Sequence, residues 1–151
     1  MTSTSTLWLF PLIVAGGVLQ AIGGPMNNAL RVSLVNPWLA TLVSFALIVP
    51  VFLVIAAVFV RPLPTVAGLA GMPWWAPLGG IVGSLAVVAG LLFIGTVGAG
   101  TYAALTVSAN LLMSILIDHF GWFGITAHSI TPQRAVGAVV LVAGVILVTA
   151  G

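Results

Sequence analysis

Hydrophobic residues occur in five long runs along this chain of 151 residues, and short stretches rich in glycine, proline and polar residues separate them. A helix needs roughly 20 mostly apolar residues to cross the hydrocarbon of a bilayer, which is about 30 Å thick. The pattern therefore predicts an all-α integral membrane protein with five transmembrane helices. The predicted spans of this single domain, residues 1–151, are residues 7–30, 38–60, 74–96, 101–117 and 134–150.

Helix-ending residues mark the connections between the runs. Asn36-Pro37 closes the first connection, Arg61-Pro62-Leu63-Pro64 stops the second run, and Gly98-Ala99-Gly100 makes a tight third turn. A longer polar loop is predicted from Asp118 to Gln133. Five spans place the two ends of the chain on opposite sides of the membrane.

Composition supports a membrane location and excludes several classes of protein. Hydrophobic residues make up 62% of the chain and charged residues 3%, whereas a soluble domain carries about 25% charged residues. Three basic residues against one acidic residue are too few for a surface that binds nucleic acid. We therefore expect the chain to contact membrane lipid and not to bind nucleic acid. The chain has no cysteine, which excludes disulfides and thiolate chemistry.

The arginines give only a weak preference for one orientation in the membrane. Arg61 and Arg134 belong to one side and Arg31 to the other. Orientation follows an excess of Lys and Arg near the cytoplasmic helix ends, and here the excess is small. One hypothesis is dual topology, in which the chain inserts both ways; the alternative is a single orientation set weakly by these residues. An inverted pair of such chains would form a ten-helix transporter with a site near the membrane midplane, of which one chain is half.

The first run is interrupted by the sequence QAIGGPMNNALR, from Gln20 to Arg31. A helix from Leu7 to Ile22 would be about 24 Å long, which is short for a span. We therefore expect it to continue through Gly23, Gly24 and Pro25, kinked or briefly unwound, to near residue 30, with Arg31 reaching the interface. The alternative is that the helix ends at Gly24.

The few ionisable residues do not form a catalytic or metal-binding pattern. The chain has one carboxylate, Asp118, and its two histidines, His119 and His128, lack the spacing of a metal site or a hydrolase triad. We expect no enzyme, metal or cofactor. Asp118 is expected to pair with Arg134 at the membrane surface; the alternative is a proton-coupling role, the usual hypothesis for an ionisable residue at membrane depth.

Neutral polar residues inside the spans are the candidates for binding a substrate. Such side chains otherwise form hydrogen bonds between helices, and that alternative stays open for each of them. The candidate substrate-binding residues are Gln20, Asn27, Asn28, Ser44, Ser84 and Asn110. Small residues at regular spacing predict close helix packing, within or between chains. These are Gly79 and Gly83 in the third run, and Gly137 and Gly144 in the fifth.

Several stretches together resemble the YdcZ-like, five-helix branch of the drug/metabolite transporter superfamily. They are GGPMNNALR, NPWLATLVSF, PWWAPLGGIVG, NLLMSILIDHFGWFG and ITPQRAVGAVVLVAGVIL, and the resemblance covers nearly the whole chain. It implies alternating-access transport of small molecules across the bacterial inner membrane. The last helix is also similar to the dimerising helix of small multidrug-resistance transporters, which work as antiparallel dimers.

One departure from those relatives limits what can be carried over. Small multidrug-resistance proteins use a membrane-embedded glutamate in the first helix, and this chain has no glutamate. The resemblance therefore does not supply a substrate or a coupling ion. A central site lined by neutral polar side chains suggests a neutral, zwitterionic or amphipathic substrate.

The leading hypothesis is a small-molecule exporter that works as an antiparallel homodimer around a central site of neutral polar groups. Two alternatives remain. The chain could pair with an inverted paralogue as one half of a heterodimeric transporter, or it could be a non-transporting membrane subunit that packs against a partner complex through its glycine faces.

Overall fold

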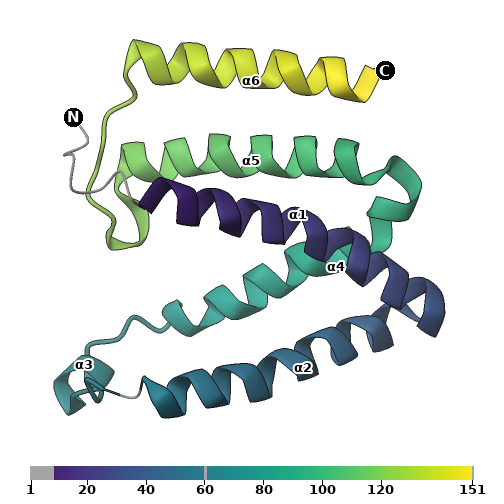
Figure 1. The fold of residues 1–151 in the computed structure, drawn as a ribbon. Helices are drawn as coiled ribbons and strands as arrows, with labels where there is room; N and C mark the ends of the chain where they lie inside the picture. The colour runs from purple at the N-terminus through teal and green to yellow at the C-terminus, as the bar shows by residue number, and fades with distance from the viewer. Residues whose placement is uncertain (1–8, 60, 151) are drawn as a thin grey trace. The chain divides into compact units, whose positions relative to one another are not determined.

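The structure, a computed structural model, describes residues 9–59 and 61–150, which form helices and connecting loops and contain no strand. Five helices are long and apolar enough to cross a membrane, which confirms the predicted all-α fold with five spans. Leu7 and Val60, which bound two predicted spans, lie outside the described residues. The elements (Figure 1) are, in order, α1 Leu9–Leu34, α2 Pro37–Val58, α3 Val66–Ala70, η2 Ala76–Leu78, α4 Gly79–Val97, α5 Ala99–Phe120, η3 Trp122–Gly124 and α6 Pro132–Ala150.

The chain divides into two compact units, residues 1–96 and 97–151. In the first unit, α1 and α2 form a hairpin with a very short turn (Figure 1). Val35 leaves the helix with φ 59°. The side chain of Asn36 then accepts hydrogen bonds from the amides of Trp38 and Leu39, at 2.9 and 3.2 Å, and Pro37 occupies the first helical position. This is the residue pattern that starts helices, because it satisfies free amides and presets φ.

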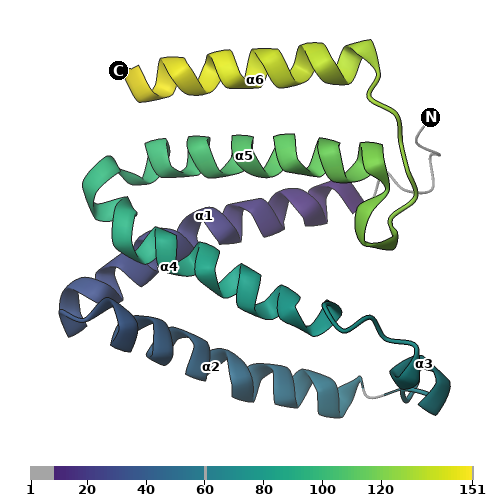
Figure 2. The ribbon, with the colours of Figure 1, turned by 180° about the vertical axis from the view of Figure 1, so that it is seen from behind.

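Helix α4 returns through the first unit and crosses α1, as both views of the ribbon show (Figures 1 and 2). The crossing is close at Gly24, because a Cβ atom on this residue would lie 2.6 Å from Cδ1 of Ile94. Ile94 and its neighbour Leu91 are buried. A glycine on α1 therefore lets α4 approach the backbone of α1.

The second unit is a pair of helices, α5 and α6, joined by a structured loop. Gly121 ends α5 in the left-handed conformation, φ 65°, with its amide bonded to the carbonyl of Ile117, as glycines after a helix commonly do. The amide of His128 then donates to the carbonyl of Asp118 at 2.7 Å. Thr131 accepts from the amide of Arg134 through its hydroxyl, at 3.3 Å, where α6 begins.

Helix α1 is longer than expected and is not interrupted. It is helical through Gly23, Gly24 and Pro25 and ends at Leu34, so it neither stops at Gly24 nor unwinds there. One proline removes one backbone donor. The remaining backbone groups must stay paired in hydrocarbon, which favours continuing the helix to the turn at Asn36-Pro37.

Two other helices also differ from their predicted bounds. Helix α5 runs from residue 99 to 120 rather than 101 to 117, because Gly98 and Gly121 take positive φ and end it on either side. Helix α4 begins at Gly79 rather than Trp74. Pro73 and Pro77 keep the intervening residues in a turn and in η2, since a proline ring cannot continue a regular helix.

Candidate functional site

Four of the five polar side chains of α1 lie on one face of the helix, and the fifth, Ser33, lies on another. At about 100° per residue, the positions of Gln20, Gly24, Asn27, Asn28 and Arg31 fall within about 100° of the helix circumference. This polar stripe begins near the middle of α1 and reaches its last turns. The part of the stripe from Gly24 to Arg31 faces α2 and α4, as the contacts of these residues establish.

Arg31 ties the end of α1 to α4. Its Nη1 donates to the carbonyls of Leu91 and Leu92, at 3.1 and 3.2 Å, and has a longer bond of 3.5 Å to Oδ1 of Asn28. Side chains on a helix lean toward its N-terminus, so Arg31 reaches inward rather than outward. The expectation that Arg31 reaches the membrane interface stays a prediction. Leu91 is about 9 Å from the end of α4, at about 1.5 Å per residue.

Asn27 ties the same face of α1 to α2. Its Oδ1 accepts a hydrogen bond of 2.9 Å from the hydroxyl of Ser44. Three of the predicted site residues thus meet around the second half of α1, together with one that was not predicted as a site residue. We call Asn27, Asn28, Arg31 and Ser44 the Arg31 cluster; all four are partly exposed.

The Arg31 cluster contains a positive charge, and the first unit has no acidic side chain to neutralise it. Residues 1–96 contain no aspartate or glutamate. The positive charge of Arg31 is met by carbonyl dipoles in the C-terminal half of α4, which is the negative end of a helix. Gly95 leaves room for this arrangement, because a Cβ atom there would lie 3.0 Å from Oδ1 of Asn28 and 3.6 Å from Nη1 of Arg31.

The other candidate residues do not join this cluster. Gln20 belongs to the stripe but is exposed, and its side chain makes no hydrogen bond to any residue that the structure describes. The hydroxyl of Ser84 donates to the carbonyl of Ile81 in its own helix, at 2.7 Å. Asn110 lies in the second unit, where its Oδ1 accepts from the hydroxyl of Ser114 at 3.3 Å. Ser84 and Asn110 therefore each form these hydrogen bonds within their own helix.

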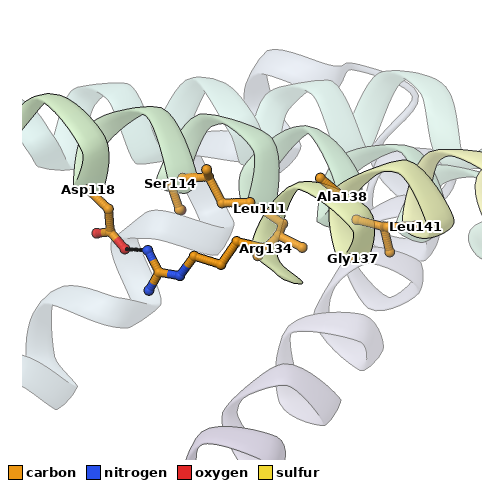
Figure 3. Close-up of a pocket in the computed structure, with 8 residues that line it drawn as sticks. Leu111, Ser114, Asp118, Arg134, Gly137, Ala138 and Leu141 are labelled. Carbon is orange, nitrogen blue, oxygen red and sulfur yellow. Dashed lines mark hydrogen bonds and ion pairs between the residues drawn. The ribbon is translucent and has the colours of Figure 1, made fainter. Parts of the chain in front are cut away.

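Asp118 and Arg134 form an ion pair between α5 and α6, with Nη1 and Oδ2 3.2 Å apart (Figure 3). Their side chains are 32% and 41% exposed, so the pair stabilises the helix hairpin weakly. It closes one end of an open groove of about 340 Å³ in the second unit. The groove is lined by Leu111, Ser114, Ile115, Asp118, Arg134, Gly137, Ala138 and Leu141.

The glycines expected to pack against other helices have open space around them. A Cβ atom on any of them would meet no atom within 4 Å. There is therefore room for a side chain or another helix at each of these positions, and Gly137 lines the groove between α5 and α6. These residues are Gly79, Gly83, Gly137 and Gly144.

Five long apolar helices, with polar side chains gathered on one helix face, define a multi-pass α-helical membrane protein. Residues 7–147 match the family described as "Putative inner membrane exporter, YdcZ", and the chain belongs to this family. The resemblance to the YdcZ-like branch is thereby confirmed, as is a location in the inner membrane. Searches of curated proteins and of solved structures found no match.

Proposed function

We propose that this chain exports a small molecule by alternating access, as an antiparallel dimer in which the polar stripe of α1 faces a shared central site. The proposal rests on the side chain of Gln20, which has no hydrogen-bond partner among the described residues. It lies near the middle of α1 and is exposed, and its amide bonds to no described residue. An unsatisfied amide in hydrocarbon costs several kcal/mol, on the order of 4–8 in an environment without hydrogen bonds. Gln20 therefore needs a substrate, water or a second chain.

The backbone beside Gln20 adds hydrogen-bonding capacity at the same depth. Pro25 lies inside α1 and has no amide hydrogen, so the carbonyl of Ala21 loses its usual partner. Free backbone groups within membrane-spanning helices are tolerated where they line a cavity, and transporters place substrate sites there. Gln20 and the carbonyl of Ala21 together offer a donor and acceptors to a substrate at mid-membrane.

An antiparallel dimer accounts for three further features. Five spans and a bias of only one arginine fit dual topology, in which two inverted copies make ten helices around one site. The open space beside Gly79 and Gly83 of α4, and beside Gly137 and Gly144 of α6, fits helix packing between two copies. In the proposed dimer, these glycines pack against helices of the second copy.

Transport by purified protein in liposomes tests the function. A panel of labelled amphipathic solutes is screened for saturable, protein-dependent counterflow. Gln20→Leu and Asn27→Ala are each expected to lower that flux about 2- to 10-fold, the effect of losing one hydrogen bond of about 0.5–1.5 kcal/mol. Ser33→Ala is the matched control, because the hydroxyl of Ser33 bonds only to the carbonyl of Ala29 and lies off the stripe. Equal flux in all four proteins would show that the stripe does not bind the substrate.

A further inference from the structure

The Arg31 cluster has hydrogen-bond donors that nothing in the described chain uses. All the hydrogen bonds of the guanidinium come from Nη1, which leaves the N–H groups of Nε and Nη2 without an acceptor among the described residues. The amide nitrogen of Asn28 is also unused there. None of these atoms is fully buried, since no buried side-chain nitrogen or oxygen of the described residues lacks a partner.

The two amide oxygens of the cluster, in contrast, each already accept one hydrogen bond. Oδ1 of Asn28 accepts from Arg31, and Oδ1 of Asn27 accepts from Ser44. The one acidic residue of the whole chain, Asp118, is paired with Arg134. The cluster therefore offers a ligand a positive charge, no negative charge, and N–H groups that have no partner among the described residues.

The geometry of arginine suits this role better than a purely structural one. Holding two carbonyls of α4 uses a single nitrogen of the guanidinium. Nε and Nη2 lie side by side in the guanidinium plane and form a rigid fork that matches two oxygens of a carboxylate or phosphate. The contact with Leu91, about 9 Å inside the end of α4, keeps the charge where salt screens it less than at an open surface.

We infer that the Arg31 cluster binds the anionic group, a carboxylate or phosphate ester, of an amphipathic molecule. Arg31 holds the anion through Nε and Nη2, and Asn28 donates a third hydrogen bond through its amide. The inference rests on the proposed function in one respect, namely that the bound molecule is the one exported. It narrows the expected substrate from a neutral, zwitterionic or amphipathic molecule to one that carries a negative group.

Binding without transport tests the inference. The full chain is placed in nanodiscs of phosphatidylcholine and titrated with hexyl phosphate, and with hexyltrimethylammonium and hexanol as cationic and neutral analogues. Saturable binding of hexyl phosphate alone is expected. Arg31→Gln is expected to weaken it at least tenfold, whereas Arg61→Gln, which removes an equal charge from an exposed loop position of the same unit, is expected to leave it unchanged.

A second variant separates anion binding from folding, because Arg31→Gln also removes the contacts with α4. Asn28→Asp places a carboxylate beside Arg31 and leaves its bonds to Leu91 and Leu92 in place. It is expected to fold with undiminished thermal stability and to bind hexyl phosphate at least tenfold more weakly than the wild type. Hexyl phosphate binding that is absent in the wild type, equalled by hexanol, or unchanged in Asn28→Asp overturns the inference.

The anion could belong to a lipid head group or to a dissolved molecule, and two nanodisc compositions distinguish them. If phosphatidylglycerol added to the nanodisc suppresses hexyl phosphate binding competitively, the site takes a lipid head group. If the affinity is unchanged, the site takes a solute. Either result supports an anion-binding site at the Arg31 cluster. A protein that binds hexyl phosphate but supports no flux in liposomes would refute the proposed function and leave the anion site standing.

Discussion

At the scale of single residues, the close approach of α1 and α4 depends on Gly24. An added Cβ atom would lie 2.6 Å from Cδ1 of Ile94, which is nearer than Cβ atoms and their neighbours come in proteins. The atom in the way is the end of a flexible side chain, in a buried residue. A small side chain at position 24 is therefore expected to destabilise the protein, and shortening Ile94 is expected to restore part of the lost stability.

Gly24→Ala is expected to lower the free energy of unfolding by about 1 kcal/mol. Overpacking costs about 1–3 kcal/mol, and replacing glycine by alanine within a helix returns about 0.5–1 kcal/mol. Ile94→Val removes Cδ1, so the double variant should be more stable than the sum of the single effects predicts. Unfolding in mixed micelles measures all three variants. Additive effects would show that Gly24 and Ile94 are not in contact.

At the scale of elements, α1 combines a continuous helix with a proline near its middle. Pro25 deprives the carbonyl of Ala21 of its helical partner, next to Gln20 on the polar stripe. Pro50 has the same effect inside α2, away from the stripe. The chain thus supplies its own matched pair of helix prolines.

Replacing either proline by alanine restores one backbone hydrogen bond and is expected to raise the free energy of unfolding, by up to about 3 kcal/mol. Only Pro25→Ala is expected to lower flux in liposomes, by about 2- to 10-fold, because it withdraws the free carbonyl of Ala21 from the substrate. Unfolding and counterflow measured on both variants check this. Equal flux in Pro25→Ala and Pro50→Ala would remove Pro25 and Ala21 from the site.

The sequence predicted the elements better than it predicted the site. Length and hydrophobicity are local properties, so the five spans and the turn at Asn36-Pro37 could be predicted from the chain alone. The partner of Arg31 could not, because it depends on where α4 crosses α1. A signal was nevertheless available: Arg31 follows Asn27 and Asn28 by four and three residues, the spacing of one helix face.

Ser84 shows, at the same scale, a limit of inferring a site from polarity alone. Its polarity within a span made it a candidate for substrate binding, yet its hydroxyl bonds to the carbonyl of Ile81 in the preceding turn. A serine in a helix can always satisfy itself in this way, whereas a glutamine amide at the position of Gln20 has no such partner in the described chain. Side chains that cannot bond to their own helix are therefore the better candidates for a site.

At the scale of the whole molecule, the central claim is that two inverted copies share a site lined by α1. In such a dimer the two-fold axis lies in the membrane plane. A residue near the middle of α1, such as Gln20, then lies close to the same residue of the second copy. A residue at the end of α1, such as Ser33, lies near the opposite surface from its counterpart, about 30 Å away.

Cysteine cross-linking in native membranes tests this claim most directly, and the natural chain has no cysteine to interfere. Single variants Gln20→Cys and Ser33→Cys are treated with an oxidant or a short bismaleimide and separated by denaturing electrophoresis. Because a disulfide needs Cβ atoms about 3.5–4.5 Å apart, a covalent dimer is predicted for Gln20→Cys and none for Ser33→Cys. Self-cross-linking of Ser33→Cys, or no dimer with Gln20→Cys under either reagent, would contradict an antiparallel pair around α1.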